Sequence, residues 1–137
     1  CIRDRPGPGV RAGKKRWEIY ESPEDVIDLQ LACGNGVFCS FYAAQYLHCD
    51  EATEALLWLG TDDGFRVYLN GEQVGESLHH DYLGDDAARV PLKLQAGRNL
   101  LIVKVSNSGY YAKLRARLTD PNGANPATIR ASVRRKE

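Results

Sequence analysis

The sequence feature that most limits the fold is an apolar period of two, which recurs from residue 16 onward between short turns. In the run FRVYLNG, Phe65, Val67 and Leu69 point to one side of an extended chain, and Asn70 and Gly71 provide a hairpin turn. Similar alternation occupies RVPLKLQAGRNLLIVKV and KLRARL, while helical periodicity is scarce. The sequence therefore predicts an antiparallel all-β domain of about eight strands, arranged as a two-sheet β-sandwich or jelly roll.

The less regular stretches give weaker predictions of the same kind. WEIYES and PEDVIDLQLAC are predicted as two strands split by a Ser-Pro turn, and ATIRASV as the last strand. A turn is expected at residues 51 to 54 and a strand at residues 55 to 59. Pro91 lacks an N–H donor, so its strand is expected to lie at a sheet edge or to begin there. The stretch GESLHHDYLGDDAAR, residues 75 to 89, has no period and is predicted to be a loop.

Length and charge place limits on organisation and partners. A chain of 137 residues suits one domain. We expect a linker at residues 1 to 15, one sandwich at 16 to 133 and a frayed tail at 134 to 137. Eighteen basic and eighteen acidic side chains cancel, so the charge does not indicate nucleic acid as a partner. No apolar run approaches the roughly 20 residues that cross a bilayer, so membrane insertion is not expected.

Four cysteines, Cys1, Cys33, Cys39 and Cys49, have the spacing of neither a zinc site nor a CxxC redox motif. Disulfides in an exported protein are expected. Glycines in the segment between Cys33 and Cys39 favour that pair, and Cys1 with Cys49 is also allowed. Free thiols in a cytosolic domain are the open alternative.

Three motifs carry a resemblance to a known family. They are a G-S/T-D-D-G turn at residues 60 to 64, an Asn-Gly hairpin at 70 and 71, and an L-x-x-G-x-N-x-L-L-V-K-V run at 94 to 105. Together they resemble the galactose-binding-like β-sandwich modules of bacterial secreted glycosidases and other large exported proteins.

The resemblance implies a non-catalytic carbohydrate-binding module, secreted or at the cell surface, that binds glycan through loops at one end of the sandwich. The alternative is a structural module that packs against other domains or subunits and binds no sugar.

Two adjacent aspartates, Asp62 and Asp63, are the candidate metal ligands. They align with an Asp-Asp pair, joined by a cis peptide, that holds calcium in lectin-like domains similar to PA14. Calcium takes roughly six to eight oxygen ligands, so others must join them. Asp81, Asp85, Asp86 and Asn107 are the candidates for this. Alternatively, the two aspartates bond to nearby backbone N–H groups, while Gly64 takes a conformation that favours glycine.

Aromatic and polar residues of the predicted loops are the candidate sugar ligands. A sugar ring offers C–H faces to an aromatic plane and hydroxyls to amides and carboxylates. Tyr82, Tyr110 and Tyr111, with Asn107 and Asp81, are predicted to bind the glycan. For each tyrosine, packing at the edge of the sandwich is the alternative.

No catalytic constellation is expected. His79, His80 and Asp81 are adjacent, and no serine, third histidine or cysteine stands at a supporting spacing. No motif selects two carboxylates for glycoside hydrolysis. The chain is therefore not predicted to be an enzyme.

Basic residues are predicted to point away from the core. If their strands are neighbours, they form a basic stripe for an anionic glycan or an acidic protein surface. A solvated sheet face with interleaved acids is the alternative. The residues are Arg66, Lys93, Lys104, Lys113, Arg115 and Arg117.

Overall fold

The computed structural model describes residues 7, 11–12, 15–21, 26–30, 39–77, 88–107 and 112–133. The described chain is all-β. Its strands are β1 (Arg11–Ala12), β2 (Lys15–Arg16), β3 (Val26–Asp28), β4 (Cys39–Cys49), β5 (Thr53–Thr61), β6 (Phe65–Leu69), β7 (Glu72–Ser77), β8 (Ala88–Leu94), β9 (Gly97–Asn107), β10 (Lys113–Thr119) and β11 (Ile129–Ser132). No helix in these residues is long and apolar enough to span a membrane.

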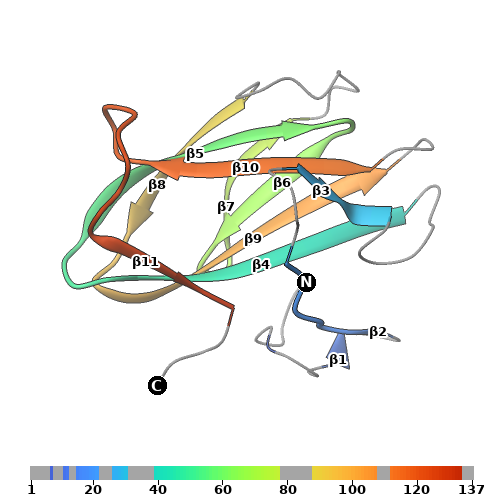
Figure 1. Ribbon diagram of the computed structural model, residues 1–137, viewed down its shortest axis with the longest axis horizontal. Helices are drawn as coiled ribbons and strands as arrows, with labels where there is room; N and C mark the ends of the chain where they lie inside the picture. Colours follow the sequence, from blue (N-terminus) through green and yellow to red (C-terminus); the bar gives the residue numbers. More distant parts are fainter. Residues whose placement is uncertain are drawn as a thin grey trace.

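Two antiparallel sheets pack face to face, as the alternation predicts. One has four strands in the order β3-β10-β5-β8, and the other has five in the order β11-β4-β9-β6-β7. Figure 1 shows these layers, with β5 and β10 above β4 and β9. A separate two-stranded sheet joins β1 to β2. The coarse prediction of an antiparallel β-sandwich is therefore confirmed.

The core lies between the sheets and uses alternate residues of each strand. Phe65, Val67 and Leu69 of β6 are buried, while Arg66 between them is exposed. Strand β8 buries Val90, Leu92 and Leu94. Pro91 is exposed on this strand, which lies at the edge of the four-stranded sheet as predicted.

Some predicted elements are wrong. Residues 17 to 21 form no strand, although their pattern alternates. Two short strands, β1 and β2, instead lie at residues 11 to 16, mostly within the predicted linker. Strand β5 begins at Thr53, inside the expected turn, and ends at Thr61. Strand β7 continues to Ser77 and β8 begins at Ala88, so both ends of the predicted loop are strand.

The predicted Asn-Gly hairpin joins β6 to β7. Asn70 and Gly71 both have positive φ angles, of 51° and 88°, as a two-residue hairpin turn requires. A bulge follows, because Val67 pairs with Gly75 while Tyr68 pairs with Gln73.

Candidate functional site

The Asp62-Asp63 turn lies at one end of the sandwich, which we call the loop end. Here β4 begins at Cys39, opposite Asn107, the last residue of β9. Strand β10 also begins here, because Leu114 pairs with Thr61 at the end of β5. This end lies to the right in Figure 1.

The strand ends that border the predicted sugar-binding segments also lie at the loop end. Ser77, the last residue of β7, pairs with Phe65 directly after the aspartate turn. Ala88, the first residue of β8, pairs with Leu59 near the end of β5. Strands β9 and β10 border residues 108 to 111. The strand ends that border residues 78–87 and 108–111 therefore lie at the end that carries Asp62 and Asp63.

Most predicted ligand residues lie outside the described residues. These are Tyr82, Tyr110, Tyr111 and Asp81, together with His79, His80, Asp85 and Asp86. Asn107 is described as the last residue of β9. Their roles stay predictions.

The aspartate turn is held by backbone and hydroxyl contacts. The Thr61 hydroxyl donates to the carbonyl oxygen of Asp63. The Ser106 N–H of β9 donates to the Gly64 carbonyl oxygen at 2.9 Å. Asp62 and Asp63 are half-buried, and Gly64 is buried. Gly64 does not have a positive φ angle. The expectation that it takes a conformation that favours glycine, which was part of the backbone-bonding alternative for this turn, is therefore wrong.

Calcium needs more ligands than the two carboxylates of this turn. The described part of the chain contains no cluster of three or more His, Cys, Asp or Glu side chains able to hold a metal ion. The peptide bond between Asp62 and Asp63 is trans, because the described residues include no cis peptide. Asp62 and Asp63 thus provide two carboxylates where roughly six to eight oxygens are required.

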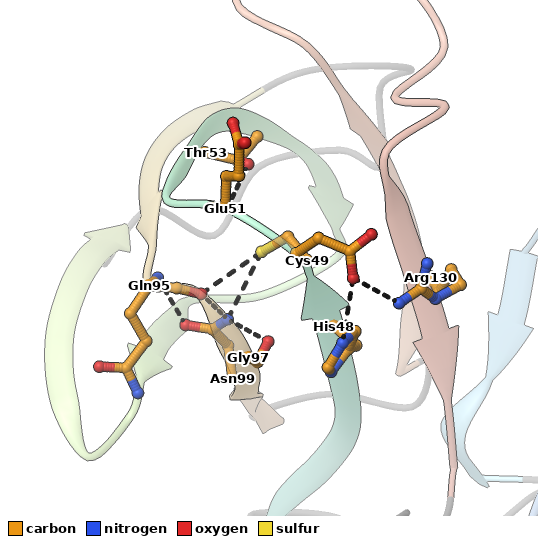
Figure 2. Close-up of polar contacts among 9 residues, drawn as sticks. His48, Cys49, Glu51, Thr53, Gln95, Gly97, Asn99 and Arg130 are labelled. Carbon is orange, nitrogen blue, oxygen red and sulfur yellow. Dashed lines mark hydrogen bonds and ion pairs between the residues drawn. The ribbon is translucent and has the colours of Figure 1, made fainter.

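The opposite end of the sandwich, which we call the hairpin end, contains a buried polar side chain that the sequence did not indicate. Asn99 of β9 is 0% exposed. Its Oδ1 atom accepts from the Gln95 N–H at 3.0 Å and from Asn70 Nδ2 at 2.9 Å. Its Nδ2 atom donates to the Gln95 carbonyl oxygen at 2.9 Å (Figure 2). Asn99 thereby joins the β8–β9 turn to the β6–β7 hairpin.

Cys49 completes this buried group. Its side chain is 0% exposed, and its Sγ atom donates to the Gln95 carbonyl oxygen at 3.4 Å (Figure 2). Asn99 Nδ2 lies 3.8 Å from the same sulfur. Both Cys39 and Cys49 are free thiols in the structure, and the expected partners, Cys33 and Cys1, lie outside the described residues. The structure thus contains neither predicted disulfide.

A small charged cluster lies on the surface beside this end. Arg130 of β11 donates to Asp50 Oδ1 at 3.0 Å, and His48 Nε2 lies 3.6 Å from the same oxygen (Figure 2). The hydrogen bond and the charge of Arg130 lower the pKa of Asp50. All three side chains are largely exposed, so this cluster is a surface ion pair.

The predicted basic stripe is divided between the two sheets. Arg66 and Lys104 pair with each other on β6 and β9 of the five-stranded sheet. Lys93, Lys113, Arg115 and Arg117 belong to the four-stranded sheet. The prediction of a single basic stripe is wrong, because the outward faces of the two sheets of a sandwich lie on opposite sides of the molecule.

Comparison of the chain with protein-family models, curated proteins and solved structures finds no match. Proposals about function therefore depend on the residues and geometry of this chain.

Proposed function

We propose that the chain is a non-catalytic carbohydrate-binding module of an exported bacterial protein, with a glycan site at the loop end. The observation that carries this proposal is the convergence of strand ends there. The ends that border residues 78–87 and 108–111 lie at the same end as the Asp62-Asp63 turn. Aromatic and polar residues of both segments can then contribute to one shallow site.

The strand order supports a finer description of the fold. Omitting β11, the sheets read β3-β10-β5-β8 and β4-β9-β6-β7. Apart from the β6–β7 hairpin, consecutive strands from β3 to β10 alternate between the sheets, as in a jelly roll built from two Greek keys. We propose that the domain is a jelly roll of the galactose-binding-like type.

The direct test is calorimetric titration with a panel of neutral oligosaccharides and polysaccharides, with and without calcium. We expect heat of binding with at least one glycan, weakened about tenfold or more by Tyr110→Ala or Tyr82→Ala. Tyr20→Ala is the matched control, because this tyrosine is 38% exposed outside both segments. No heat across the panel, with and without calcium, contradicts the proposal.

A second candidate is a structural module that packs on a neighbouring domain or a second copy. The observation that favours it is the exposure of adjacent large apolar side chains, Ile19 at 43% and Tyr20 at 38%. Sedimentation of the isolated chain tests this idea. If the chain packs on a second copy, we expect a dimer, and Ile19→Glu should dissociate it. A chain that is monomeric and also fails to bind the neighbouring domain of its parent protein contradicts this candidate.

A further inference from the structure

Strand β4 is only partly paired along one of its two sides. It pairs with β9 on one side throughout, and with β11 on the other side at residues 46 to 49. In the part of the chain that the structure describes, no strand pairs with residues 40 to 45 on that second side (Figure 1). Ser40, Tyr42 and Gln45 are exposed there. We call residues 40 to 45 the open edge.

The backbone groups that point out of the open edge are identified by the bonds of β9. The Ser106 N–H donates to the Gly64 carbonyl oxygen at 2.9 Å, so it points away from β4. In an antiparallel pair, a residue that bonds away from its neighbour lies opposite a residue that does the same. Ser106 lies opposite Ser40. Because the direction alternates along a strand, the N–H and C=O groups of Ser40, Tyr42 and Ala44 point out of the open edge.

The open edge lacks the features that discourage further pairing on the outermost strands of the two sheets. Strand β8 carries Pro91, β7 contains a bulge, and β3 and β11 have only three and four residues. Proline, bulges, charges and short length all hinder the addition of another strand. The run SFYAAQY, residues 40 to 46, contains no charge, proline or glycine. The open edge is therefore suited to accept a further strand.

The open edge is complementary to a second copy of itself. A two-fold axis at Tyr42 places Ser40 opposite the second copy's Ala44, and Tyr42 opposite its own copy. Each such pair exchanges two hydrogen bonds, so the contact makes about six. A charge near the axis would lie close to the same charge of the other copy, and this run contains none. Tyr42, which is 39% exposed, gains a cross-strand aromatic partner.

We propose that the open edge is a dimer interface, at which the β4 strands of two copies pair antiparallel around Tyr42. The two five-stranded sheets then form one continuous sheet. This interface uses a different surface from Ile19 and Tyr20 of the second candidate function. It also does not depend on glycan binding at the loop end.

Sedimentation equilibrium of the whole chain, from micromolar to millimolar concentrations, measures the dimer. We expect Tyr42→Lys to weaken dimerisation about tenfold or more, because it removes the aromatic pair and opposes two charges. Tyr20→Lys is the matched control, because Tyr20 is 38% exposed and Tyr42 is 39% exposed. Ala44→Pro is a second edge variant, since it removes an N–H that points out of the sheet rather than toward β9. Thermal unfolding checks that each variant is folded.

Amide hydrogen exchange distinguishes pairing at the open edge from any other dimer contact. As the concentration rises, the N–H groups of Ser40, Tyr42 and Ala44 should become protected. The N–H groups of Phe41 and Ala43, which point toward β9, should change less.

Weakening confined to the two edge variants, together with alternate protection, supports the proposal. A monomer at every concentration, a dimer without alternate protection, or equal weakening by Tyr20→Lys overturns it. Glycan binding at the loop end is measured separately with the Tyr42→Lys variant, so this proposal and the proposed function fail independently.

Discussion

The two ends of the sandwich are stabilised in different ways. At the hairpin end, one buried side chain, Asn99, bonds to two turns through three hydrogen bonds of 2.9 to 3.0 Å. At the loop end, the contacts of the aspartate turn include a bond from the Thr61 hydroxyl and one backbone bond from Ser106. The difference indicates that the hairpin end fixes the relative positions of strands. The loop end is where we propose the binding site.

Asn99→Leu should have the largest effect and tests the structural role of the hairpin end. The change leaves the Gln95 N–H and carbonyl and the Asn70 amide without their buried partner. We expect the free energy of unfolding to fall by roughly 3 kcal/mol or more, measured by urea denaturation. Ser106→Ala, an exposed change on the same strand, is the control. Equal losses in the two variants would remove the distinction between the ends.

Gly75→Ala tests how tightly the sheet edges meet. A Cβ atom at Gly75 would lie 2.9 Å from both Val90 Cγ atoms, and the stiff, buried valine has little room to move. We expect a loss of about 1 to 3 kcal/mol in unfolding free energy. In a Val90→Ala background, which removes both Cγ atoms, the same Gly75→Ala change should cost less. An equal cost in both backgrounds would show that the close contact is not the cause.

Thr61→Val tests the aspartate turn itself. The substitution keeps the shape of a side chain that is 8% exposed but removes the hydroxyl that donates to Asp63. We expect a loss of about 1 kcal/mol in denaturant unfolding, smaller than for Asn99→Leu. Glycan binding should also weaken if the turn belongs to the site. Stability loss equal to that of Asn99→Leu would contradict the contrast between the ends.

Arg130→Gln should have the smallest effect, because its ion pair with Asp50 is exposed. Arg130 lowers the pKa of Asp50 in the folded protein. Its contribution to stability is therefore present above the ordinary aspartate pKa and lost as pH falls through the folded value. Carboxyl NMR titration should show the Asp50 pKa rising in the variant. An unchanged pKa would show that Arg130 does not cause the shift.

Strands with one buried face were predictable from sequence. In β6 and β8, polar and apolar residues alternate because one side faces the core and the other faces solvent. Strand β4 alternates poorly because adjacent residues, Tyr46 and Leu47, are both buried. Residues 17 to 21 alternate but form no strand, since alternation alone does not provide a neighbour to pair with.

Contacts between distant residues were not predictable. Asn99 occurs in the run at residues 94 to 105 that contributes to the family resemblance. Its partners Asn70 and Cys49 are 29 and 50 residues away in the sequence. The division of the basic residues between faces also depends on strand order. Arg66 and Lys93 both point outward, but local alternation does not indicate that their strands belong to different sheets.

Strand β4 begins and ends with a cysteine, so it carries one thiol at each end of the sandwich. Cys39 is half-buried at the loop end, whereas Cys49 is fully enclosed beside Asn99. Alkylation of an enclosed thiol requires local opening, so its rate reports how often the surrounding structure opens. Peptide mapping after timed alkylation would thus report the opening of the hairpin end through Cys49, with the half-buried Cys39 of the same molecule as an internal comparison.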